Sequence, residues 1–475
     1  MKRSICILLV LVIFAGLCAC GGQGGSTGKT GLQAGFGREK ILPKNVTDAH
    51  IAGSDAANRV ATGYMDELCV TCVALKEGDE TVLIYTLDMI NSYNSVVELA
   101  KKAITELTGV PADRIIMNAT HTHSGVAMTY DWDGVVEYNL MFNEAVAKAA
   151  ETAIADLSAA QVYSGSTETE DMTFVRHYKL SNGTYYGSNY GNSAGNSIEG
   201  HAYEGDTELQ VVKFARAAED KKDIVLVSFP AHATMNSISN RMTLSADFPS
   251  PTREYIEANS DSLVAYFIGA AGDQTPSSRI AGEEFTSDYK VYGERLGKYV
   301  IDFLPNLTQN QNSGMTLVSQ TYTGKAMKEG LEKLAEAREV AEAAAAYGNS
   351  NGITVSLAAK YGFDSVYEAK AVVSRAKAPE TRTMVLKALV IGDLSFVFAP
   401  YEMFSQQSHY IKDNSPYKNN TVVITCGEGA EGYLPSEMGF TMKCYEVHVT
   451  KYVRGTAEDV AKTFVDMLAE IKGAQ

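Results

Sequence analysis

Apolar and polar positions follow two different periods along the chain, and together they predict a sheet flanked by helices. Apolar runs at 82–87 and 224–229 have the length and composition of buried strands. In contrast, apolar residues recur every three to four positions over 96–107 and 460–471, as on the buried face of a helix. The pattern predicts an α/β fold with a mixed or parallel sheet and flanking helices, and with an active site at the carboxyl ends of its strands.

The first part of the pattern predicts a strand–helix–strand unit. The strand at 82–87 is followed by a helix that begins with the sequence Ser95–Glu98, which is typical of a capping box, and ends at Gly109. A second strand follows at 114–119, so we expect the two strands to be parallel neighbours. Further strands are predicted at 264–268, 388–391, 394–399 and 421–426, with a hairpin turn at 392–393 and an Ala/Glu-rich helix at 330–346.

The N-terminus has the pattern of a secretory signal peptide. Lys2 and Arg3 precede an apolar stretch over 5–16, which is too short to cross a membrane as a stable helix. We assign residues 1–20 to this signal peptide.

The residues before Cys20 resemble a bacterial lipobox, in which the cysteine is acylated and becomes the mature N-terminus. The Gly-rich segment 21–31 that follows is a suitable flexible tether for an anchored domain at 32–475. We therefore expect an extracytoplasmic protein of the cell envelope that is bound to the membrane through a lipid on Cys20. An ordinary signal peptide cut elsewhere, or an uncleaved anchor, is the alternative.

The charge balance of the chain bears on its binding partners. The chain has 41 Lys and Arg against 57 Asp and Glu, a net charge of −16, which argues against nucleic acid as a partner.

Cys69 and Cys72 form a CxxC sequence, but no second CxxC completes a zinc ribbon. Because they lie on a predicted strand with an odd spacing, we expect them to be buried, inert thiols on opposite faces.

Two histidines follow the buried strand at 114–119. His121 and His123 lie in the segment Asn-Ala-Thr-His-Thr-His-Ser-Gly at 118–125. In an extended chain, residues two apart project to the same side, so these imidazoles can converge as two metal ligands or as a ligand and a base.

Three other predicted strands also end in groups that bind metals. His232 follows the strand at 224–229, Glu402 follows the second strand of the hairpin, and Tyr433 lies shortly after 421–426. Ligands of α/β sheets bind beyond the carboxyl ends of strands, so these groups and His121 can form one mononuclear site, most simply for zinc. Tyrosine is a rare ligand.

Two other metallohydrolase classes fit the His-x-His pair poorly. A metallo-β-lactamase-like site continues as HxHxDH, whereas Ser124 and Gly125 follow here. An amidohydrolase barrel carries the pair on its first strand, whereas at least one strand–helix unit precedes it here.

An ordered set of short motifs resembles the catalytic domain of neutral/alkaline, non-lysosomal ceramidases. The resemblance extends from about Gly35 to the C-terminal helix, and it depends on the order of the motifs because each one alone is weak. The motifs are 118–125, 245–249 (Ser-Ala-Asp-Phe-Pro), 272–276 (Gly-Asp-Gln-Thr-Pro), 400–402 (Pro-Tyr-Glu) and 445–446 (Tyr-Glu).

The resemblance implies roles for individual residues. His123 would be the general base and acid, Tyr445 an oxyanion donor and Arg176 a substrate-contacting residue. Thr275 stands where ceramidases carry serine; we place it with the substrate-binding residues, not as a nucleophile, and it can also be a turn residue before Pro276. The implied zinc ligands are His121, His232, Glu402 and Tyr433.

The resemblance therefore implies a hydrolase with one Zn²⁺ per chain that cleaves an N-acyl amide of ceramide or a related N-acyl lipid by metal-activated water. We expect one ceramidase-like domain without the further C-terminal β-domain of ceramidases. Since that domain and the serine at Thr275 are both missing, weak or no activity on long-chain ceramide is expected. The alternative from another class is a substrate-binding lipoprotein with a degenerate, non-catalytic site.

Overall fold

The computed structural model describes residues 31–53, 56–187, 195–311 and 313–474. The predicted signal peptide, Cys20 and nearly all of the predicted tether lie outside the described residues.

A larger mixed sheet forms one half of the core. Its pairs β4–β5 and β12–β14 are parallel, and the other pairs along its length are antiparallel. The parallel pair β4–β5 confirms the strand–helix–strand unit expected from the sequence. The strand order is β14 (Ser262–Ile268), β12 (Asp223–Phe229), β11 (Glu208–Arg216), β6 (Ser158–Glu168), β1 (Gln33–Lys40), β3 (Cys69–Glu77), β4 (Glu80–Leu87) and β5 (Ile115–Ala119), with β16 (Thr308–Gln309) against β6.

A smaller sheet packs against one face of the larger sheet. It has the order β17 (Thr316–Lys325), β18 (Thr381–Ile391), β19 (Leu394–Phe398) and β21 (Thr421–Ile424), and its last pair is parallel. Apolar side chains from both sheets, such as Ile84 and Phe396, form the core between them. The expected hairpin is present, since Ile391 pairs with Leu394.

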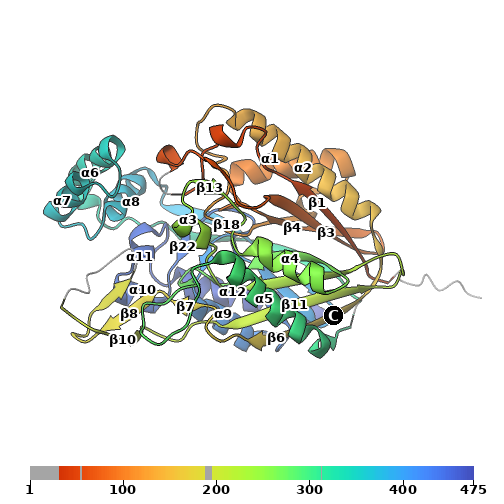
Figure 1. Cartoon of the computed structure of the whole chain (residues 1–475). Coiled ribbons are helices and arrows are strands. Elements are labelled where there is room, and N and C mark those ends of the chain that lie inside the picture. The colour runs from red at the N-terminus through yellow and green to blue at the C-terminus, as the bar shows by residue number, and fades with distance from the viewer. Residues whose placement is uncertain (1–30, 54–55, 188–194, 312, 475) are drawn as a thin grey trace, which may run out of the picture.

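Helices cover the two outer faces, so the layers run helix, sheet, sheet, helix (Figure 1). The larger sheet is covered by α1 (Asn94–Thr108), α2 (Val135–Ala155), α4 (Pro249–Asn259) and α5 (Tyr289–Phe303), and the smaller by α9 (Ser405–Asn414) and α12 (Thr456–Ala474). This arrangement confirms the predicted fold class.

Glycines on β1 let α2 approach the larger sheet closely. A Cβ atom added at Gly35 would lie 2.0 Å from the carbonyl oxygen of Ala153, and one at Gly37 would lie 2.1 Å from that of Ala149. Backbone therefore packs directly on backbone at this contact.

The predicted capping box of α1 is wrong. The residue before the helix is Tyr93, no side chain caps it, and Ser95 already lies inside the first turn. The predicted end is confirmed, because Gly109 adopts the left-handed conformation (φ 75°) that ends many helices.

A helical insert between β17 and β18 has a small core of its own. It contains α6 (Leu334–Tyr347), α7 (Gly352–Lys360) and α8 (Val366–Lys377), and Figure 1 shows it beside the sheets.

The remaining strands and α-helices are short and lie outside the two main sheets. They are β2 (Gly63–Tyr64) with β13 (Thr243–Leu244), β7 (Phe174–Val175) with β15 (Gln274–Thr275), β20 (Glu402–Met403) with β22 (Tyr433–Leu434), the strands β8 (His177–Leu180), β9 (Tyr185–Gly187) and β10 (Ile198–His201), and the helices α3 (Met235–Ser239), α10 (Glu437–Met442) and α11 (Tyr445–Val449).

Cys69 and Cys72 lie on β3 as free thiols, as the sequence predicted. Cys72 is fully buried, and burial raises the pKa of the half-buried Cys69 to about 11. Among the described residues, no helix combines the length and apolar character that a membrane crossing requires.

Candidate active site

A cavity of about 580 Å³ lies where the carboxyl ends of the parallel strands of both sheets meet. Every predicted site residue except Cys20 lines this cavity. They are His121, His123, Arg176, His232, Thr275, Glu402, Tyr433 and Tyr445. The structure thus brings these side chains to one cavity, and their chemical roles remain predictions.

The two buried histidines are oriented in the same way by neighbouring strands. His121 follows β5, and its Nδ1 lies 2.6 Å from the carbonyl oxygen of Ile90, which follows the parallel neighbour β4. His232 follows β12, and its Nδ1 lies 2.5 Å from the carbonyl oxygen of Ala271, which follows the parallel neighbour β14. With Nδ1–H donating to a carbonyl, each Nε2 offers a lone pair to the cavity.

Backbone pairing brings Glu402 and Tyr433 to the same point. After the parallel strands β19 and β21, the chain forms the short parallel pair β20–β22, in which Glu402 is the register partner of Tyr433. The Tyr433 hydroxyl lies 3.5 Å from Nε2 of His232, and the two rings are nearly parallel.

The donor atoms of this cluster face one another. Nε2 of His121 lies 3.1 Å from Nε2 of His232, and Glu402 Oε2 lies 3.2 Å from each of them. Among the described residues, this carboxylate oxygen is buried without a hydrogen-bond partner. A buried carboxylate oxygen without a partner beside imidazole lone pairs is the donor set that a divalent metal such as zinc requires.

The close packing of the cluster shifts the pKa values of its groups in different directions. Burial would raise the pKa of Glu402, but His121 and His232 outweigh that effect and hold the pKa well below its ordinary value. Burial is the main cause that lowers the pKa of His232 to about 4, and the positive charge of Arg176 is the second. The imidazole of His232 is therefore neutral at pH 7. Burial would lower the pKa of His121, but Cys426 and Glu402 outweigh that effect and raise it well above its ordinary value. Because neutral imidazoles and an ionised carboxylate are the forms that bind a cation, metal binding would displace a proton from His121.

His123 also reaches the cluster, but not by the predicted route. His121 has a positive φ of 63°, so the chain is not extended there as the spacing argument assumed. The side chains nevertheless converge, with 3.4 Å between the two Nε2 atoms and the rings nearly perpendicular. Burial, together with His121 and His232, lowers the pKa of His123 well below its ordinary value. The Nε2 atoms of the three histidines are close enough to share one ion.

Arg176 and Tyr445 both lie close to the ring of Tyr433. The Arg176 guanidinium lies 5.6 Å from the Tyr433 ring centroid, and the Tyr445 ring lies 6.0 Å from it in an edge-on arrangement. Burial, and to a smaller extent the negative charge of Glu402, raises the pKa of Tyr445. Its phenol therefore stays protonated at neutral pH and can donate a hydrogen bond.

Glu446 holds Arg176 in place, a role that the sequence did not predict. Its Oε1 accepts from Arg176 Nε at 2.9 Å and from Nη2 at 2.5 Å, while Oε2 accepts from His177 Nε2 at 3.0 Å. Glu446 is fully buried, and despite that burial Arg176 and His177 lower its pKa. The motif Tyr445–Glu446 was the only signal for it in the sequence.

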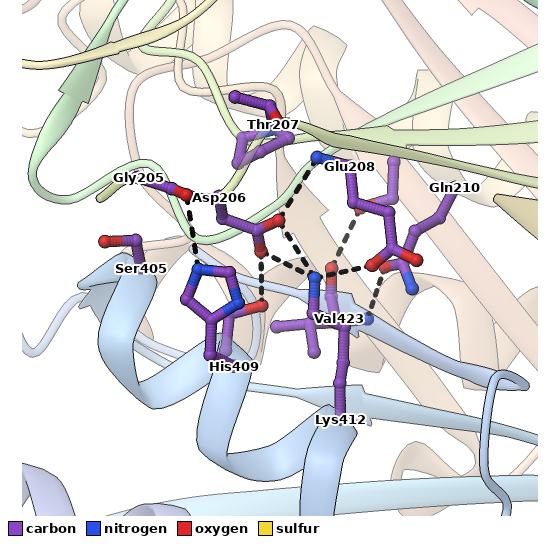
Figure 2. A network of polar contacts seen from close by, with 12 residues as sticks. Gly205, Asp206, Thr207, Glu208, Gln210, Ser405, His409, Lys412 and Val423 are labelled. Carbon is purple, nitrogen blue, oxygen red and sulfur yellow. Dashed lines mark hydrogen bonds and ion pairs between the residues drawn. The ribbon is translucent and has the colours of Figure 1, made fainter. Parts of the chain in front are cut away.

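Gln274 connects the site to a polar network around the buried Asp206. Its carbonyl oxygen lies 3.2 Å from His232 Nδ1, and its side chain bonds the backbone of Asp206 in both directions. Figure 2 shows how the Asp206 carboxylate then accepts from Lys412 on α9, which also pairs with Glu208 on β11. The network links β15, which carries Gln274, to α9 and to β11.

Comparisons with known proteins support the fold. No model of a protein family matches the chain, and no curated protein matches its sequence. Its structure is similar to that of neutral ceramidase from Pseudomonas aeruginosa, with a TM-score of 0.68 and 15% identity over 93% of this chain and 75% of that one. The chain has the fold of neutral ceramidase. A second ceramidase structure, complexed with C2, gives a TM-score of 0.68 and 14% identity over 94% of this chain and 76% of that one.

Within this ceramidase fold, the structure adds cavity residues that sequence reasoning did not select. Tyr367 reaches the cavity from α8 of the helical insert, and its ring lies 5.5 Å from that of Tyr445. Tyr178 and Arg279 line the side of the cavity near β8. No short motif marks these residues, because they come from separate parts of the chain.

Proposed function

We propose that this protein is a zinc-dependent hydrolase of N-acyl amides, with ceramide or a related N-acyl lipid as substrate. The proposal rests above all on one observation: the buried, unpartnered Oε2 of Glu402 lies equally close to Nε2 of His121 and of His232. His121, His232, Glu402 and Tyr433 would hold the ion. The fold shared with neutral ceramidase supports amide hydrolysis as the reaction class.

The chain's own residues would divide the chemistry among them. A zinc ion would supply Lewis-acid polarisation of the amide carbonyl and would favour ionisation of water near neutral pH. His123, with a low pKa, would accept a proton from the attacking water at Nε2 and deliver it to the leaving amine nitrogen. The Tyr445 phenol would donate a hydrogen bond to the oxygen of the tetrahedral intermediate.

Arg176 and Thr275 would contact the substrate. Both line the cavity, and Arg176 is held rigidly by Glu446 and by the carbonyl oxygen of Gly272. A guanidinium fixed in this way orients a polar substrate group with little loss of side-chain entropy.

We further propose that the enzyme is extracytoplasmic and anchored in the cell envelope through a lipid on Cys20. The support is the sequence pattern at 1–31 alone. Residues 32–475 would then form the hydrolase domain.

Zinc analysis combined with turnover of a short-chain ceramide tests the function. About one zinc per chain and hydrolysis that a chelator abolishes are expected. Metal-free protein that binds N-acyl lipids without turnover would instead indicate the substrate-binding lipoprotein.

A further inference from the structure

A second cavity of about 620 Å³ adjoins the candidate active site on the side of the helical insert. Of the residues that the structure describes, five line both cavities: Gly53, His123, Ser237, Ile238 and Tyr367. A substrate bound at the histidine cluster can therefore extend into the second cavity past His123.

The lining of the second cavity is polar. Ile238 is its only aliphatic side chain among the described residues. The part not shared with the active site consists of Asn58, Arg59, Arg241, Tyr347, Gly348, Asn349, Ser350 and Asn351. An alkyl chain placed here would remove amides, hydroxyls and backbone groups from water without giving them partners, which is unfavourable.

Arg59 is a structural cation rather than an anion receptor. Its Nη1 donates to the carbonyl oxygens of Ala52 at 2.7 Å and His123 at 3.1 Å. Its Nε and Nη2 both donate to the carbonyl oxygen of Arg241. With these donors engaged by backbone, Arg59 has little capacity left to bind a phosphate.

The helical insert supplies preorganised parts of this lining. Asn349 accepts a hydrogen bond from Lys370 on α8 at 3.1 Å, and Asn351 caps α7 by accepting from the amide of Ile353 at 2.9 Å. Tyr347, 58% exposed, and Tyr367 add aromatic rings. Side-chain amides beside tyrosine rings suit a ligand with hydroxyl groups on an apolar ring, as in a sugar.

The position of His123 orients the substrate. In the proposed function, on which this inference rests, His123 protonates the leaving amine, so the amine half of the substrate lies on its side. We propose that the second cavity binds a neutral polyhydroxylated group, such as a glycosyl residue, carried on the amine half of the scissile N-acyl amide.

Two substrates with the same short acyl chain and the same sphingoid base test this proposal: N-hexanoylsphingosine and its 1-O-glucosyl derivative. The glucosylated amide should have a kcat/KM about tenfold higher or more, mainly through KM. Tyr347→Ala and Asn349→Ala should each lower the ratio of the two kcat/KM values several-fold. Tyr410→Ala, which changes an exposed tyrosine on α9 outside both cavities, should leave the ratio unchanged.

Equal kcat/KM for the two substrates, or loss of both activities in parallel in the variants, would overturn the proposal. A preference for the 1-phosphate derivative over the glucosylated one would also overturn it. If no substrate is hydrolysed, the proposed function fails, but calorimetric binding still tests the cavity. Glucosylsphingosine should then bind more tightly than sphingosine, and Tyr347→Ala should remove that difference; equal affinities would refute the site.

Discussion

Glu402 and Tyr433 are register partners across the short parallel pair β20–β22, although one follows a strand of the hairpin and the other lies in the loop after β21. Backbone hydrogen bonding, including the amide of Glu402 donating to the carbonyl oxygen of Gly432 at 2.8 Å, fixes their side chains beside each other. The two groups thus face the histidines from the smaller sheet, while both histidines come from the larger sheet. The candidate site joins the two sheets.

Metal content is the first property to test. The purified protein should contain about one zinc per chain, and His121→Ala, His232→Ala and Glu402→Gln should each lose most of it because each removes one donor. Elemental analysis measures the occupancy, and circular dichroism checks the fold. His409→Ala is the matched control, since this histidine lies outside the cavity and contacts the carbonyl oxygen of Gly205 (Figure 2). Full occupancy in His121→Ala would mean that the site has been misassigned.

His123 should separate metal binding from proton transfer. If it acts as a base, His123→Ala keeps its zinc and loses roughly 10²–10⁴-fold in turnover. Zinc content and kcat measured on the same sample distinguish a base from a metal ligand. Because its Nε2 lies only 3.4 Å from that of His121, loss of zinc in this variant would make His123 a ligand instead.

Tyr445 should contribute through its hydroxyl alone. Tyr445→Phe keeps the ring that packs edge-on against Tyr367 and Tyr433, so the fold and the metal should be retained. Loss of one oxyanion donor is expected to cost about 10²–10³-fold in kcat. A wild-type kcat in this variant would show that the Tyr445 hydroxyl takes no part in the mechanism.

Asp247 should make stability depend on pH. Burial raises its pKa to about 7, although the amides of Phe248 and Asn236 donate to its carboxylate. The folded protein therefore binds a proton that the unfolded chain releases above about pH 4. This contribution to stability is fully present below about pH 4 and is lost as the pH rises through about 7. Between these two values the free energy of unfolding should fall by roughly 1.4 kcal/mol per pH unit.

Urea unfolding at several pH values measures this effect. The difference in unfolding free energy between wild type and Asp247→Asn should change across pH 4–7, whereas that for the exposed Asp131→Asn should stay constant. A constant difference for Asp247→Asn would show that the carboxyl group does not titrate in this range.

Membrane attachment should depend on Cys20. Cys20→Ser should prevent acylation, so that the protein is released or its precursor stays uncleaved. Cell fractionation and intact-mass spectrometry detect both outcomes. The same membrane fraction and the same mass in wild type and variant would exclude the lipid anchor.

The sequence alone was enough to predict the class of fold and several residues that line the candidate site. Apolar runs identified the strands β4, β5, β12, β14 and β19 within a few residues, because burial selects the same side chains wherever a strand lies. Since ligands gather at the carboxyl ends of strands, listing polar residues after each run was sufficient to select His121, His232 and Glu402. The capping box at Ser95 failed because a four-residue motif occurs inside helices as well as at their ends.

Only the tertiary structure decided how these residues meet and what surrounds them. The apolar pattern did not show that β19 and β21 belong to a separate sheet, because strand pairing depends on contacts between distant segments. It also gave no sign that Glu446 holds Arg176, or that Tyr367 of the insert lines the site and Tyr347 the cavity beside it. Local propensity specifies each element, whereas the polar contacts of a cavity arise only where elements from distant parts of the chain pack together.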